Sequence, residues 1–294
     1  MPYGRIWKLA IALILLAALY FAADWRDVRR AMAALNGRYV VLAMLLFIPQ
    51  TLVSALRWQG LAAGLCRISL AQALRQTLIG SAYNLVVPSK LGDLSKAAML
   101  PLPLGQKAAA SWRVIVEKLA DVAALAGLLA WGLCGLGLLP LSLCIGGLAI
   151  VALASRPIGS GRFAGPLAGG AALAASSIGL WALHLWQIDL FLKSAGVFVT
   201  WPEMLARVPA AIFAGLLPVS LWGMGTRDGA LVYLFQGIAS PATMAVVGLL
   251  TALRYLVPGA VGIPLAAGMG GARRSTADKI TIEANSCELA GQAT

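Results

Sequence analysis

The sequence predicts an all-α fold, a polytopic helical membrane protein with about seven to eight spans. Three observations predict this class. Only 12% of the 294 residues are charged, whereas soluble domains have about 25% charged residues. The mean hydropathy is +0.85. Several apolar stretches also approach or exceed the roughly 20 residues with which a helix crosses a bilayer. The chain is therefore not expected to contain a separate soluble domain.

The expected spans are the long apolar stretches at 6–23, 39–56, 108–139, 141–154, 163–192 and 243–268. The first stretch follows Arg5 and Lys8, as a signal peptide would. Charged residues 24–30 follow it in place of a small-residue cleavage site, so we expect an uncleaved helix. The third is long for one crossing and carries charges near its start. We therefore expect it to begin at the interface or inside a cavity.

Three shorter apolar pieces lie at 70–87, 204–217 and 229–238. The first two run into Pro88 and Pro218, and the last two flank a glycine-rich turn. Short segments interrupted by proline or glycine are typical of re-entrant, broken helices. Irregular backbone is tolerated at membrane depth only where protein or a water-filled cavity satisfies it. We therefore expect these breaks to lie around a central cavity.

The breaks at 88–93 and 218–228 resemble each other. Each has a proline, a short gap, a glycine, and then a basic and an acidic residue. Corresponding breaks in two halves fit a transporter built from inverted repeats. Two unrelated turns in a chain with 32 glycines would give the same match, so both interpretations stay open.

The net charge of +12 points first to anionic lipid head groups as partners. Nucleic acid is not expected, because the basic residues are scattered rather than gathered in one soluble patch. The four cysteines form no CxxC pair, and there is one histidine. We therefore expect no metal site, no disulfide framework and no cofactor. Residues 25–35 fit an amphipathic helix at the interface, and the polar tail 271–294 is expected to be disordered.

The first candidate site is the polar stretch 84–96, NLVVPSKLGDLSK. Proline ends the preceding helix, and Gly92 permits a strained turn. Asp93 or Ser95 can cap the next helix, whose free N–H groups attract anions. The stretch predicts a phosphate-binding corner made by Asn84, Lys90, Gly92, Asp93 and Lys96. The alternative is an interfacial loop with snorkelling lysines.

The second candidate is SWRVIVEKLAD at 111–121. Arg113, Glu117 and Asp121 are spaced by four residues and form a stripe on one helix face, with Lys118 beside it. Charges in a transmembrane segment normally face a cavity or a partner. The stripe is therefore either part of a binding site or a salt-bridged brace between helices.

The third candidate is LPVSLWGMGTRDGA at 217–230. Gly223 and Gly225 predict a tight turn before the next helix. Arg227, followed by Asp228, could bind a phosphate or pair with an acid such as Glu117. The alternative is an extramembrane hairpin turn.

Several single residues in apolar surroundings also need a partner or a cavity. Arg254 lies inside the last span, so we expect it to have a partner or to face a cavity. Arg57 and Trp58 end the second span and look like a usual interface anchor, although a substrate contact is also open. Asp189 and Lys193 are four residues apart and predict an ion pair at the end of a span.

Together the three motifs resemble the flippase-like transmembrane domain of the lysylphosphatidylglycerol synthase family, over roughly residues 5–270. Lys118 stands where that family more often has arginine, and Asp93 and Asp228 stand where glutamate is common. These departures keep the charge. Aspartate has a shorter side chain than glutamate, and lysine lacks the planar guanidinium group of arginine. The resemblance implies a flippase-like domain over 1–270, re-entrant segments around a cavity, and lipid binding or movement. We expect no lipid aminoacylation.

The function that these features favour is lipid translocation in a bacterial plasma membrane, without catalytic residues. The substrate is expected to be an anionic phospholipid or a polyprenyl-phosphate-linked sugar. Lys90, Lys96 and Arg227 would hold the phosphate, and Glu117 and Asp121 would pair with Arg227 or Arg113 when the site is empty. Two alternatives are a membrane enzyme acting on lipid phosphates or sugars and a scaffold for a lipid or glycan biosynthetic enzyme. Homo-oligomers are also open.

Overall fold

The computed structural model describes residues 24–134, 170–216 and 225–291, without the side chains of 88–90 and 269–291. All the regular elements of these residues are helices, which confirms the all-α class. In chain order they are α2 (Trp25–Ala33), α3 (Gly37–Leu45), α4 (Phe47–Ala62), α5 (Leu70–Asn84), the 3₁₀ helix η1 (Pro88–Asp93), α6 (Leu94–Met99), α7 (Leu104–Leu133), α10 (Gly170–Ser194), α11 (Trp201–Leu216), α12 (Thr226–Leu234) and α13 (Pro241–Gly291).

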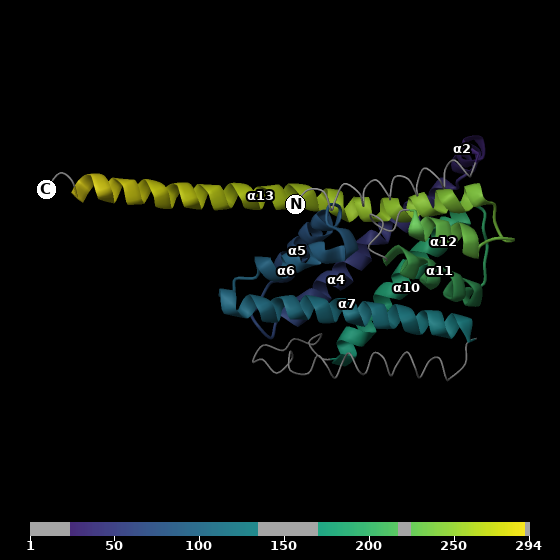
Figure 1. Ribbon diagram of the computed structural model, residues 1–294, viewed down its shortest axis with the longest axis horizontal. Helices are drawn as coiled ribbons and strands as arrows, with labels where there is room; N and C mark the ends of the chain where they lie inside the picture. The colour runs from purple at the N-terminus through teal and green to yellow at the C-terminus, as the bar shows by residue number, and fades with distance from the viewer. Residues whose placement is uncertain (1–23, 135–169, 217–224, 292–294) are drawn as a thin grey trace.

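The two longest helices, α7 and α13, run along opposite sides of the molecule (Figure 1). Helix α13 packs on α5 and α12, while α7 packs on α11, α10 and α6. Helices α4 and α10 pack against each other and touch both long helices. The centre of the molecule is therefore enclosed by α4, α5, α7, α10 and α13.

Three helical segments of the described residues are long and apolar enough to cross a membrane. They are Gly37–Ala62, Gly170–Ser194 and Pro241–Gly268, and they overlap three of the spans expected from the sequence. The expected spans at 6–23 and 141–154 lie outside the described residues. The total of seven to eight spans and the re-entrant path of the short helices therefore stay predictions.

Local sequence signals set several helix starts. Ser69 caps α5 in a reciprocal capping box, because its side chain accepts from the Gln72 N–H while Gln72 accepts from the Ser69 N–H. Asn36 caps α3, and Asp24 caps α2. Asp189 and Lys193 form the ion pair that their spacing predicts, at 2.7 Å.

Helix α13 continues to Gly291, so residues 271–291 are helical where the composition predicts a disordered tail. This stretch contains four alanines, two arginines, two glutamates and one lysine, all residue types that favour helix. Figure 1 shows this end of α13 projecting away from the other helices. The domain division at residue 270 stays a prediction.

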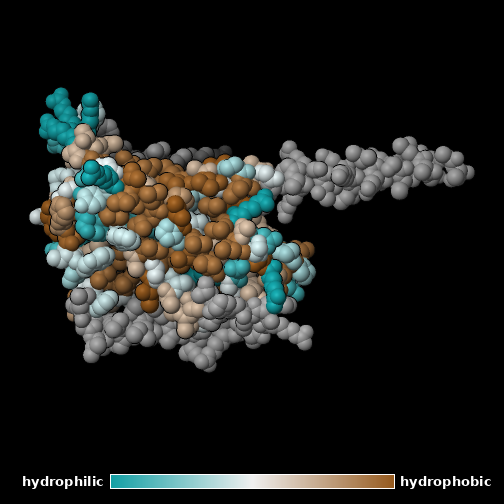
Figure 2. All heavy atoms as spheres, turned by 180° about the vertical axis from the view of Figure 1, so that it is seen from behind, coloured by the Kyte–Doolittle hydropathy of each residue, from teal (hydrophilic) through white to brown (hydrophobic). Residues whose placement is uncertain are grey.

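The surface of the described residues is largely apolar. Figure 2 shows a broad hydrophobic face, with hydrophilic residues concentrated around α2 and toward the edges of that face. A soluble domain rarely exposes a contiguous apolar patch of this extent. The face therefore fits contact with lipid.

Candidate functional site

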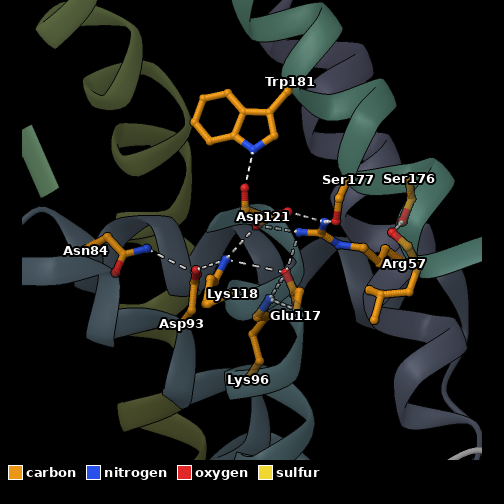
Figure 3. A network of polar contacts seen from close by, with 11 residues as sticks. Arg57, Asn84, Asp93, Lys96, Glu117, Lys118, Asp121, Ser176, Ser177 and Trp181 are labelled. Carbon is orange, nitrogen blue, oxygen red and sulfur yellow. Dashed lines mark hydrogen bonds and ion pairs between the residues drawn. The ribbon is translucent and has the colours of Figure 1, made fainter. Parts of the chain in front are cut away.

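Buried charges meet where α4, α6 and α7 come together (Figure 3). Glu117 on α7 lies at the centre and is 1% exposed. It accepts two bonds from Lys96 Nζ, at 2.9 and 3.0 Å, and one from Arg57 Nη2, at 2.9 Å. Lys96 also lies over the ring of Trp58, with Nζ 5.2 Å from the ring centroid. A buried carboxylate is stable only when paired in this way.

The outer part of the network is less deeply buried. Arg57 reaches Asp121 with Nη1 at 2.6 Å and Nη2 at 3.1 Å, so it bridges two carboxylates one helical turn apart. Lys118 Nζ lies 2.5 Å from an Asp93 oxygen. The side chains of Lys118 and Asp121 are 32% and 22% exposed. They are therefore the members of the network that a ligand can reach first.

Polar groups from other helices hold the network in place. Asn84 Nδ2 donates to Asp93 at 3.1 Å, and Arg57 donates to the Ser177 hydroxyl on α10 at 3.0 Å. Trp181 Nε1 donates to the backbone carbonyl of Asp121 at 2.7 Å (Figure 3). The network contains three cations and three carboxylates, so its charges balance.

The network forms one wall of a cavity of about 150 Å³, which is roughly five water volumes. Other residues of α4 and α5, with residues of α10 and α13, complete the lining. The lining residues are Phe47, Gln50, Thr51, Ser54, Arg57, Thr77, Ser81, Asn84, Asp93, Lys96, Glu117, Lys118, Asp121, Leu180, Trp181, His184, Arg254, Tyr255 and Pro258. The lining of this cavity includes seven charged side chains.

Arg254 differs from the other cations of this lining. It is 4% exposed, and none of the ion pairs among the described residues includes it. Its Nη2 donates to the Tyr255 hydroxyl at 2.7 Å, and its Nη1 lies 3.5 Å from Gln187 Oε1. Its Nε has no hydrogen-bond partner among the described residues. The lining thus has four cations and three carboxylates, which favours an anion.

The third sequence motif lies outside this lining. Arg227 donates to Asp228 at 2.6 and 2.9 Å and to the Gly248 carbonyl at 3.0 Å. The expected pairing of Arg227 with Glu117 is wrong, because Glu117 is already surrounded by Arg57, Lys96 and Lys118. Gly225 has a φ of 87°, which explains why glycine stands at this turn. Gly223 lies outside the described residues.

The second motif is divided between two environments. Glu117 and Asp121 face the cavity, but Arg113 donates to the backbone carbonyl of Leu61 and is absent from the cavity lining. The three residues lie on one face of α7, as expected, but different helices pack against this face along its length. The expected pairing of Arg113 with Glu117 or Asp121 is therefore wrong, and Arg57 takes that place.

The first motif is irregular, as the proline predicts, and forms the 3₁₀ helix η1. Gly92 has no positive φ. A Cβ there would lie 2.5 Å from the backbone nitrogen of Asn84. Glycine is therefore needed because η1 and α5 approach closely, and not because the backbone is strained. The side chain of Asp93 does not cap α6, nor does that of Ser95, because Asp93 is held by Lys118 and Asn84. The Lys90 side chain lies outside the described part.

No sequence pattern identifies Arg57 as the cation with the most bonds in the network. Arg57 and Trp58 were expected to anchor an interface, yet they are 1% and 0% exposed. An arginine at the end of an apolar segment looks the same in either position, so no local signal separates them. No sequence pattern marks Thr77, Ser177 or Trp181 as site residues either, because single polar residues are frequent in membrane helices.

The family comparison supports the resemblance that the three motifs indicate. A family model described as the lysylphosphatidylglycerol synthase TM region matches residues 5–158. The chain belongs to this family. The match to the lysylphosphatidylglycerol synthase TM region includes the whole charge network on α4 to α7, but it does not include Arg254 or the Arg227 motif. No curated protein matches the chain.

Membership of this family, with the apolar helices, identifies a membrane protein related to lipid metabolism. Within the described residues, no group of histidine, cysteine, aspartate or glutamate side chains is arranged to hold a metal ion.

Proposed function

We propose that the chain is a lipid translocase of a bacterial plasma membrane, which binds the head-group phosphate of an anionic lipid in the cavity. One observation carries this proposal: the buried guanidinium of Arg254 lines the cavity and has no carboxylate partner among the described residues. A buried charge that lacks a partner is unfavourable. A lipid phosphate supplies the missing charge and accepts hydrogen bonds from the guanidinium.

The ion network gives the phosphate a path across the cavity. A phosphate oxygen can replace Asp93 at Lys118 or Asp121 at Arg57, since Lys118 and Asp121 are the more exposed members. Each replacement keeps a charge-assisted bond on the cation, and it leaves the displaced carboxylate on the cavity lining. The acyl chains stay in lipid while the head group moves between Arg254 and the network.

This assignment changes the roles expected from the sequence. Arg254 replaces Arg227 as the phosphate-binding arginine, and Arg57 replaces Arg113 as the partner of the two acids when the cavity is empty. Transport by this route needs no nucleotide site, so the movement is facilitated or coupled to an ion.

The test is transbilayer movement of labelled lipids in proteoliposomes. Arg254→Gln should lower the rate for anionic lipids about ten- to a hundredfold, because a hydrogen bond to a charged group contributes about 1.5–3 kcal/mol. Arg254→Lys should retain part of the rate. Arg207→Gln is the matched control, since Arg207 pairs with Glu203 outside the cavity. Wild-type rates in folded Arg254→Gln protein would contradict the proposal.

A further inference from the structure

Helix α2 is attached to the rest of the protein along one narrow side. Val28 is buried and packs on Ala242 and Val246 at the beginning of α13. Ala31 and Leu35 follow Val28 by three and seven residues and extend this contact, as helical spacing requires. The remaining residues of α2 are exposed. Most of the helix surface therefore faces the surroundings of the protein.

Three arginines lie on the side of α2 away from this contact. Arg26, Arg29 and Arg30 are all exposed, and their spacing of three and four residues places them together. Arg30 pairs with Asp27 at 3.0 Å. None of the ion pairs among residues 24–134, 170–216 and 225–268 includes Arg26 or Arg29. This side of α2 therefore presents two guanidinium groups without an acidic partner in those residues.

An apolar edge borders the arginines. Trp25 and Met32 are 63% and 48% exposed, and residues seven positions apart lie on one side of a helix. The guanidinium carbon of Arg29 is 5.7 Å from the centroid of the Trp25 ring. Tryptophan favours the level of the lipid head groups, and arginine binds phosphate oxygens with its planar fork. The pair fits a lipid surface better than water.

The carboxylates of this region lie on the opposite edge of α2. Asp24 and Asp27 line an open groove of about 500 Å³ between α2 and the beginning of α13. Neither Trp25 nor Arg29 contributes to this groove. The helix thus has an apolar edge, then a basic side, then an acidic edge. A helix that lies in the interface needs this order, with the apolar edge in lipid and the carboxylates in water.

The position of α2 in the molecule agrees with such a placement. It lies beside the beginning of α13 and stands out from the other helices (Figure 1). Figure 2 shows the hydrophilic residues around α2 at one corner of the broad hydrophobic face. The segment Pro241–Gly268 of α13 is apolar enough to span a membrane. A helix docked where a span begins lies at the level of the head groups.

We propose that α2 is a docking surface for the anionic lipid head groups of the surrounding membrane. Arg26 and Arg29 bind phosphate groups, and Trp25 anchors the helix at the same depth. This surface is separate from the central cavity, to which α2 contributes no residue. The inference therefore does not depend on the proposed function.

The test measures which lipids gather beside α2 when the full chain is in proteoliposomes. A fluorophore is attached at Ala33→Cys, an exposed position on the arginine side, in a chain without its native cysteines. Phosphatidylglycerol and phosphatidylcholine carry the same nitroxide quencher on an acyl chain. Because one arginine contributes roughly fivefold at an anionic surface, quenching should show about a twentyfold preference for phosphatidylglycerol. Salt at about 1 M should remove most of it, since the Debye length is then about 3 Å.

Three substitutions test the assigned roles. Arg26→Gln and Arg29→Gln should each lower the preference for phosphatidylglycerol about fivefold, and the double variant should remove it. Asp27→Asn should raise the preference about two- to fivefold, because Arg30 is then released from its pair and joins the basic side. All three residues are exposed, so the fold should not change.

Arg75→Gln is the matched control for the loss of one positive charge. Arg75 is exposed on α5, a helix that meets α13 near Gly259 and Gly262 rather than at its beginning. Equal losses in the Arg75→Gln and Arg29→Gln variants would overturn the proposal, because net charge would then attract the lipid. Equal quenching by the two lipids in the wild type would also overturn it, and would favour an acidic soluble partner for α2. Neither result affects transport through the cavity, which Arg254→Gln tests separately.

Discussion

At the scale of single residues, Glu117 is the group on which the buried charges depend. It is within 3 Å of both Lys96 and Arg57, and all three side chains are at most 2% exposed. Asp121 shares Arg57 with it, but the side chain of Asp121 is 22% exposed. The two acids lie one turn apart on the same helix face, so the sequence alone predicts the same environment for both side chains. Burial makes them different.

Removing the Glu117 charge should therefore destabilise the protein more than removing the Asp121 charge. Glu117→Gln leaves the buried Lys96 without a carboxylate among the described residues, and breaking a buried pair costs about 3–5 kcal/mol. Asp121→Asn should cost about 1 kcal/mol, because Arg57 keeps Glu117. The free energy of unfolding in detergent, followed by circular dichroism, measures both. Equal losses would show that burial does not set the strength of these pairs.

At the scale of elements, η1 and α5 approach so closely that only glycine fits between them. A Cβ at Gly92 would lie 2.5 Å from the Asn84 nitrogen and 2.6 Å from its side-chain oxygen. This contact keeps Asn84 beside Asp93 and fixes one corner of the cavity. The break in the helix therefore positions a carboxylate, rather than presenting a helix end to the ligand.

Gly92→Ala should lower the free energy of unfolding by about 1–3 kcal/mol, the usual effect of overpacking, and should also weaken lipid binding. Gly105→Ala is the control, since a Cβ there meets nothing within 4 Å, and alanine favours helix. Measured side by side, the control should match or exceed wild-type stability. A neutral Gly92→Ala variant would mean that η1 can shift without affecting the site.

At the scale of the whole molecule, α7 separates the cavity from the surroundings. Trp112, Ile115, Leu119 and Val122 are exposed along one side of α7. Their spacing of three and four residues places them on one face, opposite Glu117 and Asp121. The charges of α7 exclude it from the apolar candidate spans, yet those charges point inward. We therefore expect α7 to cross the membrane with its apolar face in lipid.

Cysteine labelling tests this placement. In a chain without its native cysteines, Ile115→Cys in open membranes should react with an apolar maleimide but not with a charged one. Arg26→Cys on the exposed helix α2 should react with both. Rapid reaction of position 115 with the charged reagent would place that face of α7 in water.

Local sequence patterns predict the helical membrane class, the irregular break at Pro88, the stripe containing Glu117 and Asp121, and the need of Arg254 for a partner or a cavity. These follow from composition, proline chemistry and helical periodicity, which are local. Which charges meet depends on how the helices pack in three dimensions. Arg57 lies 60 residues from Glu117 along the chain and joins it only because α4 packs near α7. Arg227 has Asp228 beside it, whereas Arg254 lines the cavity without an acidic partner in the part of the chain that the structure describes. Pairing depends on three-dimensional proximity, and sequence spacing does not encode proximity between helices.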